Sequence, residues 1–278
     1  MAEIRHALDL RNPLPCEARG RGHESSQMAE PRHALVTGGG RGIGLAIAQA
    51  LAGEGMRLTL VGRGLARLEA AAKPLKAHPI AADVADAKAV ERAHAEAVER
   101  NGPVDVLVNN AGIVETALVT KTSLDMWEQL LRVNLTGAFL WCKAVVPGMT
   151  ERKWGRIVNI GSTTSQKGYA YVAAYAASKH GLLGLTRSLA MEVVKAGVTV
   201  NAVCPGYTET DIVTEAVKAI VAKTGKDEAF AEASLTQYNP QGRLIKPEEV
   251  AATVLWLVRP GSESVTGQAI SLSGGEIM

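Results

Sequence analysis

Aromatic residues, paired cysteines and long apolar runs are scarce in this 278-residue chain, and each scarcity excludes a class of protein. Aromatic side chains make up only 4% of the residues, so we do not expect a stacking platform for single-stranded nucleic acid. The formal net charge is +2, from 30 basic and 28 acidic residues, which lacks the basic excess of many nucleic-acid-binding proteins. No window of about 18 apolar residues without a charge is present, so no membrane-spanning helix is expected.

The cysteines and histidines are too dispersed to indicate a metal site. Cys16, Cys142 and Cys204 form no C-x-x-C pair, which disfavours a zinc site or a disulfide framework and fits a reducing, cytoplasmic compartment. The six histidines form no H-x-H or H-x-x-x-H pair, so we expect no bound metal. Hydrophobic residues at 47% and charged residues at 21% are typical of a folded globular protein rather than a disordered one.

Residues 1–27 differ in composition from the rest of the chain. They mix arginines with acidic residues, prolines and glycines, and they contain no apolar stretch of the kind that a secretory signal needs. The acidic residues also argue against a transit peptide. We expect a disordered leader here, or an extension upstream of a natural start at Met28. Residues 28–278 are expected to form one domain.

From His33 onward, short apolar runs alternate with longer helical patterns. The predicted strands are 33–37, 57–61, 79–82, 104–108, 156–160, 198–203 and 268–272, and the predicted helices are 42–54, 65–76, 87–100, 124–150, 173–196 and 247–258. This alternation predicts an α/β domain with a doubly wound, Rossmann-type parallel sheet and right-handed crossovers. A polar, Lys- and Glu-rich stretch at about 208–240 is expected to form a helical substrate lid.

A glycine-rich turn, TGGGRGIG at residues 37–44, follows the first predicted strand and opens the first predicted helix. Gly38 permits a tight turn, Gly42 lets the backbone approach a phosphate, and Gly44 allows close helix–strand packing. The N-terminus of the helix then presents free N–H groups to a pyrophosphate. In this strand–turn–helix context the pattern predicts a dinucleotide site, with a plain flexible turn as the alternative.

The G-x-x-x-G-x-G spacing of this turn resembles that of the short-chain dehydrogenase/reductase family. Further motifs of that family follow in order: Asp83-Val84, the NNAG run at 109–112, Asn134, Ser162, the Y-A-A-S-K run from Tyr175 to Lys179, and Pro205-Gly206. The resemblance covers about residues 33–275. It implies an NAD(P)-dependent oxidoreductase and a seven-stranded sheet in the order 3-2-1-4-5-6-7.

Residue chemistry supports a proton-transfer site built on the Y-A-A-S-K run. Tyr175 and Lys179 are four residues apart on a predicted helix, so they share a face. A nearby ammonium is expected to lower the phenol pKa from about 10 toward neutrality, where proton transfer is efficient. Ser162, at the end of a strand, can hydrogen-bond a substrate oxygen. An isolated Y-x-x-x-K pair would more often lie on the surface.

The resemblance implies the same roles for these residues. Tyr175 would be the acid/base, and Lys179 would bind the nicotinamide ribose and tune the tyrosine. Ser162 would polarise the carbonyl group, and Asn134 would hold a water of the proton relay. Together they are the expected catalytic residues.

The end of the second predicted strand indicates the cofactor. NAD-preferring enzymes place an acidic residue there for the ribose hydroxyl, whereas this chain has Gly62-Arg63-Gly64. A 2′-phosphate would suit Arg63, assisted by Arg41 from the glycine turn, so NADP is expected. NAD would be accepted as well if Arg63 is solvated or pairs with Glu69.

The resemblance places further residues around the cofactor. An acid and an apolar residue would contact the adenine, a short backbone run would lie beside the cofactor, and a Pro-Gly motif with two threonines would flank the nicotinamide. The expected cofactor-binding residues are Gly38, Arg41, Gly42, Ile43, Gly44, Arg63, Asp83, Val84, Asn110, Ala111, Gly112, Tyr175, Lys179, Pro205, Gly206, Thr208 and Thr210.

The predicted activity is an NADP(H)-dependent interconversion of a ketone and a secondary alcohol. Residues 181–186, 198–210 and 242–250 resemble 3-oxoacyl reductases, including polyketide ketoreductases, so the expected substrate is a 3-oxoacyl thioester on CoA or a carrier protein. Val172 stands where 3-hydroxybutyrate dehydrogenases use a lysine for a free carboxylate, which favours a neutral substrate. The alternatives are a dehydrogenase that oxidises a hydroxyacyl-CoA or an alicyclic or aromatic alcohol, and a non-enzymatic nucleotide sensor.

Two surfaces suggest partners. Lys218, Lys223 and Lys226 on the lid could attract a CoA or carrier phosphate, although solvated lysines are the commoner explanation. Two long predicted helices carry apolar residues on more than one face, which predicts a homotetramer that buries them. Those residues are Val133, Phe139, Leu140, Val145, Leu182, Leu185 and Leu189.

Overall fold

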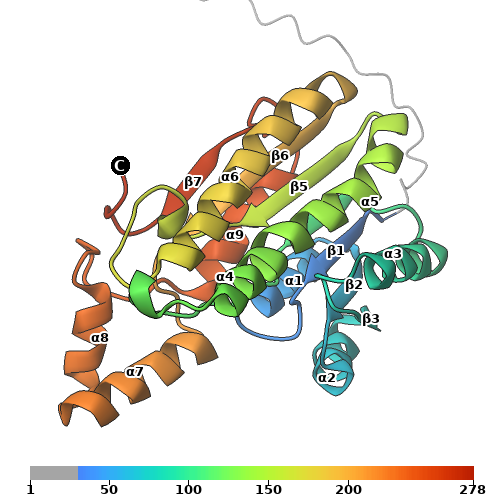
Figure 1. The fold of residues 1–278 in the computed structure, drawn as a ribbon. Helices are drawn as coiled ribbons and strands as arrows, with labels where there is room; N and C mark the ends of the chain where they lie inside the picture. The colour runs from blue at the N-terminus through green and yellow to red at the C-terminus, as the bar shows by residue number, and fades with distance from the viewer. Residues whose placement is uncertain (1–30) are drawn as a thin grey trace, which may run out of the picture. The chain divides into compact units, whose positions relative to one another are not determined.

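A parallel sheet runs through residues 31–278, the part of the chain that the computed structural model describes. Within this range, seven strands lie in the order β3-β2-β1-β4-β5-β6-β7, and every neighbouring pair is parallel (Figure 1). They are β1 (His33–Thr37), β2 (Arg57–Gly62), β3 (His78–Ala81), β4 (Val106–Asn109), β5 (Gly155–Ile160), β6 (Val198–Pro205) and β7 (Ala269–Leu272). The order confirms the doubly wound sheet and reverses direction between β1 and β4, where such sheets open a crevice. The leader expected at 1–27 lies outside the described residues.

The central strands are buried along their length because helices cover both faces of the sheet. All residues of β1, β5 and β6 are buried. One face carries α1 (Gly42–Gly53), α2 (Leu65–Leu75) and α9 (Pro247–Val258), and the other carries α3 (Ala87–Asn101), α5 (Gly137–Glu151) and α6 (Ala173–Val193) (Figure 1). Ile47 of α1 and Val254 of α9 share one apolar cluster, whereas Trp141 of α5 belongs to the other.

Most predicted strands differ from those of the structure by one or two residues at an end, and two of them are displaced at both ends. β3 is His78–Ala81 rather than 79–82, and it accommodates Pro79 because an edge strand leaves one side without ladder hydrogen bonds. β4 is Val106–Asn109 rather than 104–108, because its pairing with β1 begins at Ala34 and Val106.

The single helix predicted at 124–150 was also wrong. The chain forms α4 (Leu124–Leu131), a π-helical segment (Arg132–Thr136) and α5. The π segment contains the buried Asn134, and such wide turns often mark functional positions. Apolar periodicity runs through all three segments, so it does not reveal the wide turn.

Two helices lie outside the sheet layers, in the range predicted for the lid. α7 (Asp211–Thr224) and α8 (Glu228–Thr236) follow β6 and project away from the sheet (Figure 1). They pack on each other through Val213, Val217 and Ala231. Of the lid lysines, Lys218 pairs with Glu215 at 2.9 Å, and the Lys226 ammonium lies 3.8 Å from the centre of the Phe230 ring.

Exposed large apolar residues lie on α4, on α5 and at the end of α6, and Phe139 is the member of the set named from sequence that is among them. Val145, Leu182 and Leu189 are buried within the described domain, so they are not available for subunit contacts. The exposed large apolar residues of this region are Leu124, Trp127, Phe139, Met191 and Val194. The predicted tetramer interface would therefore use these residues.

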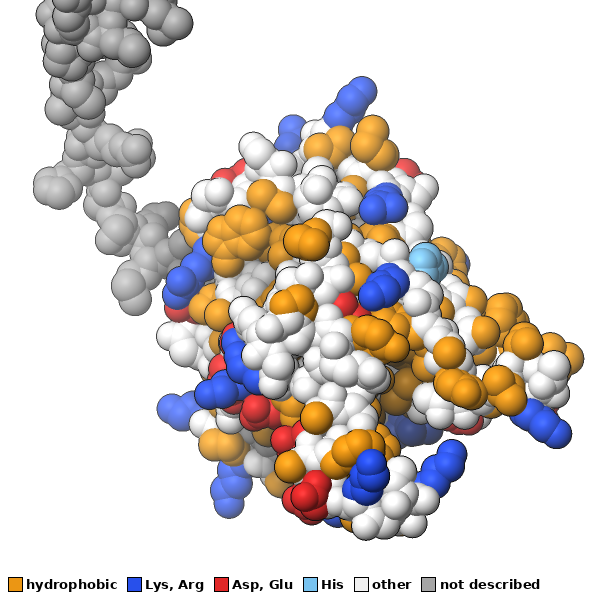
Figure 2. Space-filling view, turned by 90° about the vertical axis from the view of Figure 1, so that its left-hand side faces the viewer, with side chains coloured by type: hydrophobic (Ala, Val, Ile, Leu, Met, Phe, Trp, Pro, Cys, Tyr) orange, Lys and Arg blue, Asp and Glu red, His pale blue; other side chains and the backbone are white. Residues whose placement is uncertain are grey.

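The charged surface is mixed. On the face that Figure 2 draws, Lys and Arg side chains are scattered among acidic, polar and apolar side chains rather than gathered in one basic stripe. Among helices of residues 31–278, none combines the length and hydropathy needed to cross a membrane. Over the same range, no group of three or more His, Cys, Asp and Glu side chains is arranged to hold a metal ion.

Candidate active site

A cavity of about 800 Å³ opens at the carboxyl ends of the central strands. The glycine turn after β1, the ends of β2, β4, β5 and β6, and the first lid helix line it. All seventeen residues predicted to bind the cofactor line this one cavity, as does Ser162. Asn134 lies behind it, on a separate small cavity.

The glycine turn is packed too tightly for side chains. Gly38 and Gly42 have φ of +65° and +50°, in the left-handed region that favours glycine. A Cβ at Gly44 would lie 2.3 Å from the Gly38 carbonyl oxygen and 2.5 Å from Asn110 Nδ2, so only glycine fits there. The first turn of α1 therefore lies directly against the strand end, with its N–H groups facing the cavity wall.

Thr37 and Asn110 brace this turn, and the role of Thr37 was missed from the sequence. Thr37 Oγ1 accepts hydrogen bonds from the N–H groups of Asn110 and Ala111, both at 3.0 Å. Asn110 Nδ2 donates to the carbonyl oxygens of Thr37 at 3.0 Å and Gly38 at 3.2 Å. The turn after β1 and the loop after β4 are thereby fixed to each other on both sides of the switch point.

Basic side chains border the far end of the cavity. Arg63 follows β2 as predicted, and Arg67, in the first turn of α2, lines the same cavity. Arg63 makes no ion pair with Glu69 or any other acid of residues 31–278. Arg41 is engaged instead, with its guanidinium 3.2 Å from Asp211 at the start of the lid. The structure thus leaves Arg63 and Arg67 as the cations most available to a 2′-phosphate.

The residues expected at the adenine stand beside this basic end. Asp83 Oδ1 accepts a hydrogen bond from the Ala85 N–H at 2.9 Å, which fixes the carboxylate on the cavity rim. Val84 is buried, and a Cβ at Gly137 would lie 2.9 Å from Val84 Cγ2. Val84 is therefore packed firmly into the wall, and the Asp83 carboxylate is oriented on the rim.

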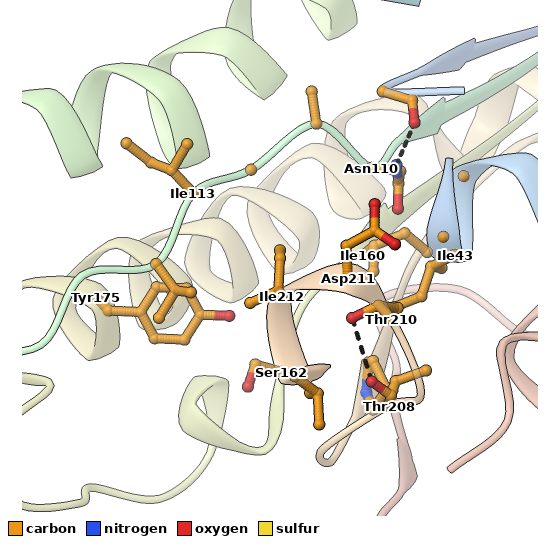
Figure 3. A pocket seen from close by; sticks show the side chains of 18 of the residues that line it. Ile43, Asn110, Ile113, Ile160, Ser162, Tyr175, Thr208, Thr210, Asp211 and Ile212 are labelled. Carbon is orange, nitrogen blue, oxygen red and sulfur yellow. Dashed lines mark hydrogen bonds between the residues drawn. The ribbon is translucent and has the colours of Figure 1, made fainter. Parts of the chain in front are cut away.

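Ser162 and Tyr175 point into the opposite part of the cavity. Ser162 follows β5, Tyr175 projects from the first turns of α6, and Figure 3 shows their hydroxyl groups turned toward the same space. Ser162 Oγ also accepts a hydrogen bond from the Thr164 N–H at 3.2 Å. Two hydroxyl groups thus converge where a substrate oxygen could contact both.

The pKa of Tyr175 is shifted opposite to the expected direction. Burial raises it, and hydrogen bonds with Ser162 and Thr164 only partly oppose the rise. Lys179 is near, with its Nζ 5.8 Å from the centre of the Tyr175 ring, but that Nζ donates to the Ile160 carbonyl oxygen at 2.8 Å. Burial also lowers the pKa of Lys179 to about 8. Loss of water around the two groups is the largest cause of both shifts.

Asn134 is fixed by three hydrogen bonds. Its Oδ1 accepts from the Ile113 N–H at 2.8 Å, and its Nδ2 donates to the Ile113 carbonyl at 2.9 Å and to Ser178 Oγ at 3.0 Å. Asn134 and Lys179 line the small second cavity, whose volume of about 10 Å³ is close to the room that one water needs. Trp141 Nε1 and Asn109 Oδ1 also belong to residues lining it and have no partner in the described chain.

The two threonines after β6 form a turn beside the cavity. Thr208 Oγ1 donates to the Gly206 carbonyl at 3.0 Å, and Thr210 Oγ1 donates to the Thr208 carbonyl at 3.2 Å (Figure 3). The Gly206 N–H donates to Leu272 of β7 at 2.9 Å. The Pro205-Gly206 run is thus held at the edge of the sheet, where it borders the cavity.

Several lining residues were missed because they come from loops without a recognisable pattern. Most are apolar or aromatic and lie at the end of the cavity that contains Ser162 and Tyr175. They include Ile113, Val114, Tyr169, Tyr207, Ile212 and Leu235, together with the acidic Glu276.

Known proteins resemble this chain over most of its length. A family model described as short chain dehydrogenase matches residues 32–220. The acetoacetyl-CoA reductase of Shinella zoogloeoides is 42% identical over 249 residues, which cover 88% of this chain and 98% of that protein. The 3-oxoacyl-(acyl-carrier-protein) reductase MabA of Mycobacterium tuberculosis is 39% identical over 244 residues, covering 88% of this chain and 92% of that protein. A crystal structure of an actinorhodin polyketide ketoreductase variant with NADPH matches with a TM-score of 0.85 and 40% identity, covering 88% of this chain and 97% of that one.

Proposed function

The chain belongs to the short-chain dehydrogenase family, and from that premise we propose that it is an NADPH-dependent oxidoreductase that reduces a 3-oxoacyl thioester to the 3-hydroxyacyl thioester. One observation carries the proposal: a single cavity joins a glycine turn and free arginines at one end to Ser162, Tyr175 and Lys179 at the other. This arrangement lets a dinucleotide and a carbonyl substrate meet in one space.

The cavity suits NADPH. The close-packed turn of Gly38, Gly42 and Gly44 leaves only backbone where a pyrophosphate would approach, and Arg63 and Arg67 can receive a 2′-phosphate. When bound, the nicotinamide supplies the hydride that reduces the carbonyl carbon. The chain's own residues then have to hold the substrate oxygen and deliver a proton to it.

Ser162 and Tyr175 perform these two tasks. The Ser162 hydroxyl donates a hydrogen bond to the carbonyl oxygen and favours the negative charge that develops there. The Tyr175 hydroxyl donates its proton to the same oxygen as the alcohol forms. Because burial raises the pKa of Tyr175, the phenol carries its proton at neutral pH, as reduction requires.

Lys179 and Asn134 restore the proton. Below its pKa of about 8 the Lys179 ammonium is charged and stabilises the phenolate that remains after transfer. Asn134 is held rigidly by Ile113 and Ser178 beside the one-water cavity that it shares with Lys179. A water there can pass a proton toward Tyr175 through Lys179.

An acyl substrate fits the end of the cavity that contains the hydroxyl groups. Its walls include Val114, Val172, Ile212 and Leu235, which give an apolar surface for an acyl chain. The relatives named as acetoacetyl-CoA and 3-oxoacyl-carrier reductases support a 3-oxoacyl thioester. The same residues operate in reverse, so oxidation of a hydroxyacyl thioester is the alternative direction.

A turnover screen tests the proposal. NADPH consumption is measured with acetoacetyl-CoA, with its N-acetylcysteamine analogue, and with a cyclic ketone that has no thioester. We expect efficient reduction of the two thioesters and slower reduction of the cyclic ketone. Absence of turnover with both thioesters, together with oxidation of an alicyclic or aromatic alcohol by NADP⁺, would overturn the proposal and favour an alcohol dehydrogenase.

A further inference from the structure

The segment after β7 returns to the cavity and packs against the end of the lid. Gly274 and Gly275 have φ of +60° and +96°, and a Cβ at Gly274 would lie 1.9 Å from Asn239 Oδ1. A Cβ at Gly275 would lie 3.3 Å from Pro240. The two glycines therefore allow a close turn that brings Glu276 to the cavity wall.

The Glu276 carboxylate is held on the loop that precedes α6. Its Oε1 accepts a hydrogen bond from the Tyr169 hydroxyl and lies 3.8 Å from Lys167 Nζ. The Glu276 side chain is only 7% exposed, whereas that of Lys167 is 44% exposed. Figure 1 shows the chain after β7 beside this loop. The carboxylate is thus fixed in place with little access to bulk water.

Glu276 places a negative charge on the wall at this end of the cavity. Its charge contributes to the raised pKa of both Tyr169 and Tyr207, which line the same end. Lys167 offsets the charge only in part, because an exposed ammonium is more strongly screened by water. Val172, which also lines the cavity, carries no charge that could attract an anion.

We propose that Glu276 is a specificity-determining residue that admits 3-oxoacyl groups carried as neutral thioesters and disfavours 3-oxo acids with a free carboxylate. The inference rests on the proposed function and extends it to substrate selection. In a short 3-oxo acid the carboxylate is separated from the reacting carbonyl by one carbon, so it must enter the same part of the cavity. Two carboxylates in a site of low dielectric repel each other, whereas a thioester carbonyl is not repelled.

Binding measurements on the NADP⁺ complex test the inference without turnover. Dissociation constants are measured by calorimetry for acetoacetate and for acetoacetyl-N-acetylcysteamine, with the parent and with Glu276→Gln. The glutamine keeps the size and one oxygen acceptor for Tyr169 but removes the charge. We expect Glu276→Gln to strengthen the binding of acetoacetate relative to that of the thioester by about tenfold. Lys167→Met removes the offsetting cation, so it should shift the ratio in the opposite direction.

Matched controls separate this inference from a structural role and from the proposed function. Glu99→Gln makes the same charge change on the exposed surface of α3 and should leave the ratio unaltered. Glu276→Asp retains the charge and should preserve discrimination. An unchanged ratio in both Glu276→Gln and Lys167→Met would overturn the inference. Equally weaker binding of both probes by Glu276→Gln would also overturn it, because that result indicates a structural role. Discrimination in binding without reduction of the thioester by NADPH would refute the proposed function alone.

Discussion

Lys179 Nζ donates a hydrogen bond of 2.8 Å to the backbone oxygen of Ile160, the last residue of β5. The bond ties the helix that carries Tyr175 to the strand end that precedes Ser162. The ammonium is therefore placed by the sheet as well as by its own helix, and it is kept away from water. This placement explains why burial lowers the pKa of Lys179 to about 8.

Replacing Lys179 should change how stability depends on pH. The folded pKa of about 8 lies below the value of about 10.5 in an unfolded chain, so the unfolded state binds more protons between these two values. Parent stability should therefore rise relative to Lys179→Met as pH increases from about 8 to about 10.5. Urea unfolding of nucleotide-free protein across this range measures the difference, and a constant difference would contradict the prediction.

Tyr175→Phe should lower the turnover number by about 10²–10⁴-fold, because general acid catalysis is lost. NADPH affinity should change little, since the glycine turn and arginines bind the far end of the cofactor. Tyr171→Phe is a matched control because Tyr171 is 60% exposed and nearby in sequence. Stopped-flow turnover and NADPH fluorescence titration measure the two effects. Turnover within about tenfold of the parent would refute the acid role.

Arg63→Ala should weaken NADPH much more than NADH. Hydrogen bonds to charged groups contribute about 1.5–3 kcal/mol, which corresponds to roughly 10- to 150-fold in affinity. Arg41→Ala should have a smaller effect because its guanidinium pairs with Asp211. Michaelis constants for both cofactors measure the preference, with Arg92→Ala on the exposed surface of α3 as the control. Equal efficiency with both cofactors in the parent, unaltered by Arg63→Ala, would show that NADP is not selected here.

Gly44→Ala should destabilise the fold and impair nucleotide binding, because its Cβ would lie 2.3 Å from the Gly38 oxygen. Gly53→Ala, in the same helix, meets no atom within 4 Å and should be neutral or stabilise the protein by up to about 1 kcal/mol. Thermal unfolding with and without NADPH compares the two variants. Equal melting temperatures of the two variants, with equal stabilisation by NADPH, would mean that the glycine turn accommodates the extra Cβ and would contradict the prediction.

Light scattering should give a mass of four times the 29.2 kDa chain. The exposed residues Phe139 at 47% and Met191 at 78% are expected to be covered in that assembly. The Phe139→Asp variant should therefore form smaller species than the parent, because it places a charge in an apolar contact. A monomeric parent at micromolar concentration would contradict the prediction.

The sheet and the glycine turn could be predicted because their signals are local. Buried, mainly apolar runs such as 198–203 and the spacing of Gly38, Gly42 and Gly44 follow directly from burial and from turn geometry. The pairing of Arg41 with Asp211, and of Tyr169 with Glu276, joins residues more than 100 positions apart, and no local pattern encodes either. The direction of the Tyr175 pKa shift depended on burial, which the spacing of Tyr175 and Lys179 does not specify.

The π-helical segment at Arg132–Thr136 sets the rotational phase of everything that follows it in α5. The wide turn holds one residue more than a regular turn, and an α-helix advances about 100° per residue, so winding the same residues as a regular α-helix would rotate α5 by roughly that angle. Trp141 and Val145 would then leave the core, and Asn134 would lose its hydrogen bond from the Ile113 N–H. The extra residue therefore couples two properties that are usually independent, the packing of a core helix and the aim of a polar side chain. A lineage in which this segment wound as a regular α-helix, with no residue removed, would have to rebuild both together.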